Sequence, residues 1–473
     1  MAVFQSAERI LPAVMRARLS PVLRKLPALI RSSDPRHLAQ RMALVAFAIR
    51  VVSAAIAFVS QIILARMMGG FEYGIFVFVW VLAVLFGNLS CLGFHSAIIR
   101  FLPLYHARDA VAEIRGLTTA TRIFALVSAT GLMVVGLAAL HLLAPLIEAY
   151  YVAPLFLALF CLPMVALGDI MEGTARAHSW PVQALSPTYI IRPVLILVLM
   201  VLAVSLGEPH TAATAMAAAL GATYLTTVTQ FLILTRRLER RYEQGPRSLE
   251  FALWLKAAVP IFVVEAFGFL LTNSDTVVVG LYLEPDRVGV YFAAAKTMAL
   301  VHFVMFSVKA AVAPRFSAAM ADPDRRQLAV IAVESARWTF WPSLGVGLSV
   351  LAAGPFLLSL FGPDFTEGYV VMVILFAGIM AKALVGPGEA FLTMAGHQNL
   401  CVPLYAVALA VNIALNMVLI PRFGLEGAAA AGAGALMVEA ILLHLAVRHT
   451  FGIVLFAFAN PNAMARTTEA GPR

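Results

Sequence analysis

The chain contains little charge and almost no cysteine. Lys, Arg, Asp and Glu together make up 12% of its 473 residues, about half of the share in ordinary soluble domains. A soluble globular core does not explain this composition. The three cysteines, Cys91, Cys161 and Cys401, lie far apart inside apolar stretches and form no CxxC pair. This spacing argues against disulfides and against a zinc site.

Motifs for catalysis and nucleotide binding are absent as well. The sequence has no P-loop, so ATP does not drive this chain directly, and neither a Ser/His/Asp order nor a metal motif supports an enzyme. The run of glycine and alanine at 427–435 opens no βα unit, and close packing of helices explains it better than a dinucleotide loop. We therefore expect no catalytic residue, no metal ion and no cofactor.

Apolar sequence is abundant. Apolar residues make up 62% of the chain, and a membrane-spanning helix needs about 20 consecutive residues that are mostly apolar. Runs of this kind lie near 42–65, 74–96, 119–143, 150–172, 187–206, 212–235, 256–281, 288–312, 338–361, 368–394, 401–420 and 425–447. The sequence therefore predicts an all-α integral membrane protein with about 12 transmembrane helices.

Basic residues mark one side of the membrane. The net charge of +9 does not indicate nucleic acid binding, because Lys and Arg cluster at the ends of the apolar runs. They accumulate in the N-terminal tail and in the loops at 97–118, 236–250 and 315–327, whereas the intervening loops hold few cations and several acids. The positive-inside rule then predicts that both termini are cytoplasmic.

The two halves of the chain are faintly similar. A shift of about 215 residues places Gly74 on Gly289 and Arg100 on Arg315, which indicates an internal repeat. An even number of helices per half predicts two six-helix pseudo-symmetric lobes around a central cavity that opens alternately to each side. The predicted segments are an N-lobe at 42–235, a basic cytoplasmic linker at 236–255, a C-lobe at 256–447 and a cytoplasmic tail at 448–473. Residues 1–41 are predicted to form a basic amphipathic cytoplasmic segment, and a loose tail would explain them equally well.

Three basic residues lie deep in the predicted spans. Arg50, Lys296 and Lys382 are about 12 Å or more from the nearer span end at 1.5 Å per residue, and buried charges in a bilayer are functional candidates because they are costly. Arg50 shares one helix face with Gln61, so that face is predicted to line a cavity. Lys382 either binds a ligand or pairs with Glu389, seven residues later on the same face.

Other charged residues have simpler explanations. Several cations lie within about two turns of a cytoplasmic end and are predicted to snorkel to the headgroups; they are Arg122, Arg192, Lys256, Lys309 and Arg337. Asp169, Glu172 and Arg176 share a face near a cytoplasmic end and are predicted to form a structural ion-pair ladder.

Several motifs, in order along the chain, resemble a known family. They are IILARMMG at 62–69, EYG at 72–74, NSDTVVVG at 273–280, APRFS at 313–317 and LIPRFGLEGAA at 419–429. The chain resembles the polysaccharide-lipid flippases (Wzx type) of the MOP superfamily, which are relatives of the MATE exporters, over nearly all of 42–447. Members of that family often have fourteen spans, so their terminal helix pair is not carried over to this chain.

The resemblance implies a function and a set of partners. It implies a flippase of the bacterial inner membrane that moves an undecaprenyl-diphosphate-linked oligosaccharide, an O-antigen or exopolysaccharide unit, from the cytoplasmic to the periplasmic leaflet by alternating access. The implied partners are this lipid-linked substrate, membrane lipids, Na⁺ or H⁺, and a polysaccharide polymerase and glycosyltransferases of the same pathway.

Diphosphate charges need cations in the cavity. The predicted substrate site is therefore Arg50, Gln61, Lys296 and Lys382. The residues predicted to supply counter-charge, or to bind the driving cation, are Glu265, Asp275 and Glu439, of which Glu265 and Asp275 are the better coupling candidates.

Two alternatives remain open. A cation-coupled multidrug exporter of the same fold would present acidic and aromatic residues to cationic drugs, and the deep cations argue against it. A membrane-embedded polysaccharide polymerase or ligase would carry catalytic residues in a large periplasmic loop, whereas every predicted outer loop here is short.

Overall fold

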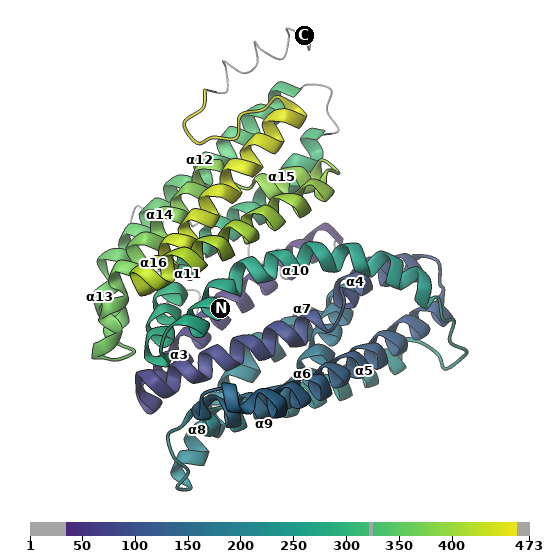
Figure 1. Ribbon diagram of the computed structural model, residues 1–473. Coiled ribbons are helices and arrows are strands. Elements are labelled where there is room, and N and C mark those ends of the chain that lie inside the picture. Colours follow the sequence, from purple (N-terminus) through teal and green to yellow (C-terminus); the bar gives the residue numbers. More distant parts are fainter. Residues whose placement is uncertain (1–34, 321–324, 461–473) are drawn as a thin grey trace, which may run out of the picture.

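The computed structural model describes residues 35–320 and 325–460. Within these ranges the chain forms helices joined by short connections and contains no strand (Figure 1). Most of the predicted N-terminal segment at 1–41 and the end of the predicted tail at 448–473 lie outside the described residues.

The described part confirms the prediction of about 12 spans. It contains 9 helices that are long and apolar enough to cross a membrane. Two of these are pairs of helices, because α3 (Pro35–Leu89) loses helical geometry at Gly69 and α16 (Cys401–Phe451) loses it at Gly424. A further long helix, α12 (Arg325–Ala352), completes the bundle.

The remaining helices have the following bounds. Those that form a span or most of one are α5 (Val111–Leu143), α6 (Ala149–Ala177), α8 (Arg192–Ser205), α9 (Ala212–Arg241), α10 (Phe251–Tyr282), α11 (Pro285–Met320) and α14 (Tyr369–Val385). The short ones are α4 (Phe94–Ala107), η1 (Ala144–Leu146), α7 (Pro181–Ser186), η2 (Pro187–Ile191), α13 (Gly354–Ser359), η3 (Pro363–Gly368), α15 (Gly388–Met394) and η4 (Gln398–Leu400). The segments α7, η2 and α8 follow one another without a break and form a single span.

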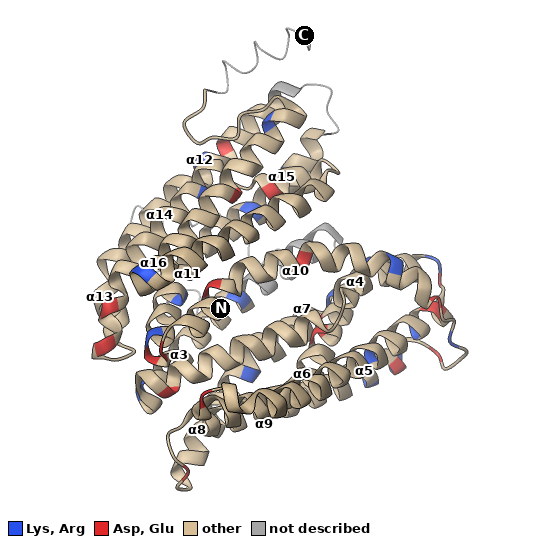
Figure 2. Cartoon of the chain, viewed as in Figure 1, with Lys and Arg blue, Asp and Glu red and all other residues tan. Residues whose placement is uncertain are grey.

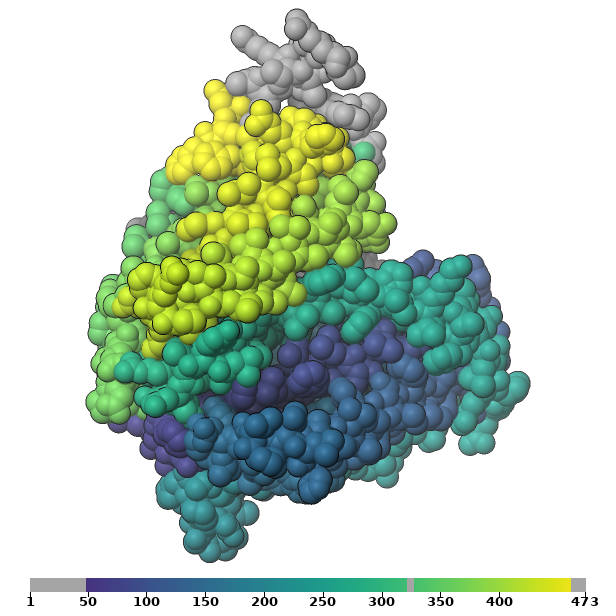
Figure 3. All heavy atoms as spheres, in the orientation of Figure 1, coloured from purple at the N-terminus to yellow at the C-terminus, as the bar shows by residue number. Residues whose placement is uncertain are grey.

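The helices are arranged in two lobes (Figure 1). Helices α3 to α9 form the N-lobe, and helices α11 to α16 form the C-lobe. Helix α10 contacts α3 and α4 of the N-lobe and also α16 of the C-lobe, so it bridges the lobes. In Figure 3 its teal surface separates the yellow and green surface of the C-lobe from the blue surface of the N-lobe. Charged residues are sparse along all of these helices (Figure 2).

The lobes meet tightly at the end of the molecule that contains Gly69. A Cβ added to Gly74 would lie 1.6 Å from the backbone oxygen of Pro285, so only glycine permits this approach of the two backbones. Arg66 of the N-lobe donates hydrogen bonds of 2.7 and 2.5 Å to the backbone oxygens of Leu360 and Ser359 in the C-lobe. These contacts seal the space between the lobes at this end.

Small residues also allow close packing inside the C-lobe. A Cβ on Gly378 would lie 2.6 Å from Ala433 Cα, and one on Gly432 would lie 2.5 Å from a carboxylate oxygen of Asp275. The glycine- and alanine-rich run at 427–435 therefore serves helix packing, as the sequence predicts. After Phe451 the chain leaves the helix and lies along the C-lobe, where Arg337 donates to the backbone oxygens of Ala457 and Ala459.

Candidate functional site

Two adjoining cavities lie beside each other, one within the C-lobe and one between the two lobes. The first, the C-lobe cavity, has a volume of about 420 Å³ and is walled by α10, α11, α14 and α16. The second, the inter-lobe cavity, has a volume of about 320 Å³ and lies between α3, η2 and α8 of the N-lobe and α10 and α11. Asn273, Phe292, Lys296 and Ala299 line both cavities, so the two spaces meet at these residues.

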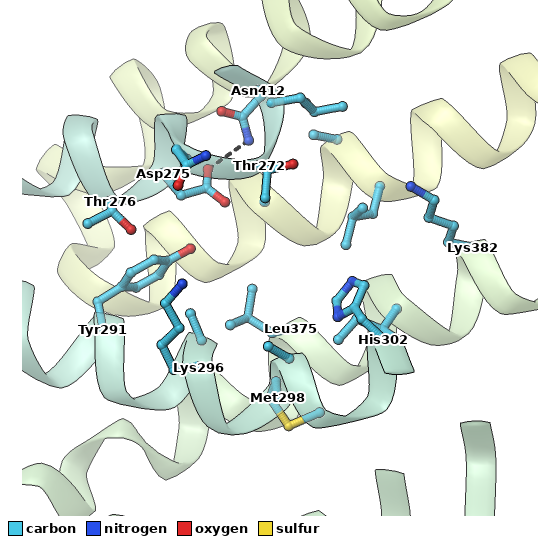
Figure 4. Close-up of a pocket in the computed structure, with 18 of the residues that line it drawn as sticks. Thr272, Asp275, Thr276, Tyr291, Lys296, Met298, His302, Leu375, Lys382 and Asn412 are labelled. Atoms are coloured by element: carbon cyan, nitrogen blue, oxygen red, sulfur yellow. Dashed lines mark hydrogen bonds between the residues drawn. The ribbon is translucent and has the colours of Figure 1, made fainter. Parts of the chain in front are cut away.

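Lys296 stands where the cavities meet. Its side chain is exposed to this space, and its Nζ lies 4.9 Å from the ring centroid of Phe292. Figure 4 shows it reaching toward the side of the C-lobe cavity that contains Tyr291. No carboxylate among the described residues forms an ion pair with Lys296. An aliphatic stem on apolar neighbours with a free ammonium group is suited to binding an anion.

Arg50, predicted to lie on a helix face that lines a cavity, lies between η2 of the N-lobe and α11 of the C-lobe. Its guanidinium carbon is 4.9 Å from the ring centroid of Phe306 in α11 and 5.7 Å from that of Tyr189 in η2. Arg50 lines neither cavity. It lies one helical turn before Ala54, which lines the inter-lobe cavity. Gln61, on the same helix face, lines the inter-lobe cavity and accepts a 3.0 Å hydrogen bond from the hydroxyl of Tyr73.

Arg192, which its position in the sequence predicts to snorkel to the headgroups, is instead a cavity residue. It lines the inter-lobe cavity, with its guanidinium carbon 5.5 Å from the ring centroid of Trp80. Arg192 follows directly after the π-helical turn η2, which contains an extra residue in its turn and so changes which face the next residues present. Pro187 at the start of that turn was the available signal in the sequence, but a proline alone does not reveal a π-helix.

Lys382 lines the C-lobe cavity and pairs with Glu439, with 2.7 Å between Nζ and the nearer carboxylate oxygen. Glu439 is buried and lines the same cavity. The alternative pairing of Lys382 with Glu389 is wrong, because Glu389 pairs with Lys309 at 2.7 Å. The helical spacing fails because the chain leaves the helix at Gly386, whose φ is 71°, and this turns Glu389 onto a different face.

Asp275 lies in a polar cluster beside the C-lobe cavity. Its Oδ1 accepts hydrogen bonds of 2.7 Å from Asn412 and 3.0 Å from Asn416, both on α16. The hydroxyl of Tyr291 points toward the same carboxylate (Figure 4). The buried Oδ1 of Asn416 has no hydrogen-bond donor among the described residues. This concentration of oxygen atoms is the environment that hard cations prefer.

Glu265 lies apart from these residues. It lines neither cavity, and its carboxylate accepts a 2.5 Å hydrogen bond from Ser96 and lies 3.1 Å from His95 Nε2. Both partners belong to α4, so Glu265 fastens α10 to the N-lobe. The predicted ladder is present only in part, because Glu172 pairs with Arg176 whereas Asp169 accepts a 2.9 Å hydrogen bond from Asn88.

The two lobes and the cavity between them define a multi-pass membrane transporter of the MOP fold, and solved structures agree. An inward-facing multidrug resistance MATE family transporter aligns with a TM-score of 0.69 at 14% identity, over 88% of this chain and 96% of that one. The lipid II flippase MurJ aligns with a TM-score of 0.68 at 16% identity, over 86% and 87% of the two chains. A MOP superfamily transporter from Pyrococcus furiosus, described as having a binding pocket of reversed polarity, aligns with a TM-score of 0.61 at 16% identity. The alignment covers 89% of this chain and 96% of that one.

The family model for polysaccharide biosynthesis proteins matches residues 40–320, and the MatE model matches 260–418. The chain belongs to the polysaccharide biosynthesis protein family. A relative, the probable low-salt glycan biosynthesis flippase Agl15 of Haloferax volcanii, is 22% identical over 177 residues. That match spans 37% of this chain and 37% of the relative. The predicted resemblance to the flippases of the MOP superfamily is confirmed.

Proposed function

We propose that this protein moves an undecaprenyl-diphosphate-linked oligosaccharide across the bacterial inner membrane, from the cytoplasmic to the periplasmic leaflet. The observation that carries the proposal is the free cation at the meeting point of the two cavities, Lys296, with Arg192 on the opposite wall of the inter-lobe cavity. Each cavity falls in the range of about 300–1,000 Å³ that is typical of small-molecule sites, which suits a diphosphate and the first sugar.

Charge decides which headgroup this space favours. Lys296, Arg192 and Arg50 form no ion pair with a carboxylate of the described residues. Keeping an unpaired cation within a membrane span costs about 3 kcal/mol or more, and a diphosphate offsets that cost while it is bound. In the C-lobe cavity Glu439 neutralises Lys382, so this pair supplies a cation only when the substrate phosphate competes with the carboxylate.

The seal between the lobes at one end supports alternating access. The positive-inside rule assigns the basic 236–250 linker and both termini to the cytoplasm. The end sealed by Arg66 and Gly74 is then periplasmic, and substrate enters the cavities from the cytoplasmic side. In this proposal the predicted N-lobe at 42–235 moves against the predicted C-lobe at 256–447, and α10, which begins the predicted C-lobe, contacts helices of both.

The driving cation is assigned to Asp275. Its carboxylate, the two asparagines of α16 and the Tyr291 hydroxyl form an oxygen-rich site for Na⁺ or H⁺ next to the C-lobe cavity. Glu265 is less suited to this role because it lines neither cavity and instead contacts His95 and Ser96 of α4. The chain acts as a transporter rather than an enzyme, and the polymerase and glycosyltransferases of the same pathway make and use its substrate.

A multidrug exporter is the second candidate, and the MatE match at 260–418 favours it. A cavity for cationic drugs needs exposed carboxylates. Here Glu439 is paired with Lys382, and Asp275, held by two asparagines, is the residue assigned above to the driving cation. Among the described lining residues, two cations without an ion pair, Lys296 and Arg192, outnumber the one carboxylate without a basic partner, Asp275, so the net unpaired charge is positive and disfavours a cationic drug.

The experiment that tests the flippase proposal compares two lysines. Lys296→Gln removes the cation that lines both cavities, whereas Lys256→Gln removes an exposed lysine from α10 that lines neither cavity. We expect Lys296→Gln to reduce glycan export at least about tenfold, the effect of losing one charge-assisted hydrogen bond. Lipid-linked precursor should accumulate in the inner leaflet, and Lys256→Gln should export normally. Equal export by both variants contradicts the proposal.

A further inference from the structure

A third cavity lies at the opposite end of the N-lobe from the Gly74 seal, beside the basic linker. Its volume is about 140 Å³, and it shares no lining residue with the C-lobe cavity or the inter-lobe cavity, which together we call the transport cavities. Helices α5 and α9 form two of its walls and the linker forms the third. We call it the linker cavity, and its lining residues are Ile114, Arg115, Thr118, Thr119, Arg122, Thr235, Leu238, Glu239, Tyr242, Gln244 and Arg247.

Arg122 lacks acceptors for part of its guanidinium group. Its Nη1 donates a 3.1 Å hydrogen bond to Thr235, and its guanidinium carbon lies 5.2 Å from the ring centroid of Phe231. Its Nε and Nη2 are buried, and neither has a hydrogen-bond partner among the described residues. A buried donor without an acceptor costs about 1–3 kcal/mol, and more when the donor is charged. The linker cavity beside this side chain is where an acceptor from outside the chain fits.

The linker is fastened over the cavity. Ser248 donates a 3.0 Å backbone hydrogen bond to Ala112, and Arg115 donates a 2.9 Å hydrogen bond to the backbone oxygen of Glu243. A Cβ on Gly116 would lie 1.7 Å from the backbone oxygen of Ser248, so glycine is required for this approach. The contacts hold the linker at a fixed place on α5 and bring Arg247 to the cavity wall.

The charge of the linker cavity favours an anion. Three arginines line it, Arg115, Arg122 and Arg247, against one acid, the exposed Glu239. Arginine forks donate pairs of hydrogen bonds to groups with several acceptor oxygens, such as phosphate. The volume of 140 Å³ is below the range of about 300–1,000 Å³ for drug-sized ligands, so a single phosphoryl group fits this space better than a nucleotide.

We propose that the linker cavity binds a phosphoryl group, as the headgroup of an anionic phospholipid or as free phosphate. A basic pocket between transmembrane helices at the cytoplasmic surface lies at the level of lipid phosphates. The bound phosphoryl group accepts hydrogen bonds from Arg122 and Arg247, and so ties α5 and α9 to the linker that joins the lobes. This binding does not depend on which substrate crosses the transport cavities.

The experiment measures binding to the full-length purified protein by native mass spectrometry. The probes are phosphatidylglycerol, phosphatidylcholine and inorganic phosphate, each added to delipidated protein. The variants are Arg122→Gln, Arg247→Gln and, as the matched control, Arg240→Gln, which removes an exposed arginine of α9 that does not line the linker cavity. Because Arg247 lies on the exposed linker, its substitution leaves a folded protein even where Arg122→Gln does not.

The three probes distinguish the sources. A lipid headgroup is identified if the protein binds phosphatidylglycerol more tightly than phosphatidylcholine. Arg122→Gln and Arg247→Gln should then weaken the binding of phosphatidylglycerol at least about tenfold, and Arg240→Gln should not. Binding of inorganic phosphate with the same dependence on the two arginines identifies the free anion. If all variants bind each probe as the unaltered protein does, or if the unaltered protein binds none of them, the linker cavity is not a phosphoryl site.

Discussion

At the scale of residues, the cations near the cavities differ in their partners. Lys296 and Arg50 lie against aromatic rings, whereas Lys382 is neutralised by Glu439. A ring contact is worth about 0.5–2 kcal/mol and leaves most N–H donors of the cation free. We therefore expect Lys296 and Arg50 to bind substrate charge directly, and Lys382 to respond only after its ion pair opens.

Substitutions at Arg50 test its role as a counter-ion. Arg50→Lys should retain partial export, because the charge survives while the bidentate fork is lost. Arg50→Ala and Arg50→Glu should abolish export and cause the lipid-linked precursor to accumulate. A purely structural role makes a different prediction, since Arg50→Ala would then lower the thermal stability and the loss would not add to that of Phe306→Ala. Normal export by a stable Arg50→Ala protein removes this arginine from the site.

Asp275→Asn tests the assigned cation site. The substitution removes the negative charge with little change in shape, so the polar cluster with Asn412 and Asn416 keeps its packing. In proteoliposomes we expect the variant to lose the stimulation of transport by an imposed Na⁺ or pH gradient. Glu265→Gln should keep that stimulation, because Glu265 holds α10 to α4. Unchanged gradient dependence in Asp275→Asn assigns the coupling to another group.

At the scale of elements, the helices were predictable and two local breaks were not. Apolar runs define spans because a bilayer offers no hydrogen bonds to exposed backbone, so 42–447 was predicted as a bundle of helices. The ion pair between Lys382 and Glu439 joins different helices, and one-dimensional spacing cannot reveal it. The break at Gly386 and the π-helical turn before Arg192 each rotate the residues that follow. Regular helical spacing therefore predicts the wrong helix face for Glu389 and for Arg192.

The seal between α3 and α11 makes a prediction about Gly74. Gly74→Ala places a methyl group where the oxygen of Pro285 lies, so the two backbones must separate. With spin labels on the exposed residues Glu208 and Asp364, we expect the distance between the lobes at this end to increase. Gly131→Ala is the matched control, since a Cβ there has no neighbour within 4 Å. If Gly74→Ala leaves the label distance unchanged, this contact does not set the conformation.

At the scale of the whole molecule, α10 couples the two lobes. Its first half contacts α4, where Trp254 donates a 2.9 Å hydrogen bond to Tyr105, and its second half carries Asp275 toward α16. A cation that binds or leaves at Asp275 thus acts on the same helix that holds the N-lobe. Sequence repeats predicted the two lobes, but the bridging role of α10 follows only from contacts between distant segments.

The central claim is that the cavity carries a lipid-linked diphosphate and not a cationic drug. The most direct measurement is the movement of a fluorescent undecaprenyl-diphosphate oligosaccharide between the leaflets of proteoliposomes that contain the purified protein, beside ethidium uptake in the same vesicles. We predict transfer of the lipid-linked oligosaccharide, lost in the Lys296→Gln variant, and no ethidium uptake above that of empty vesicles. Ethidium uptake without transfer of the lipid-linked oligosaccharide would contradict the flippase account.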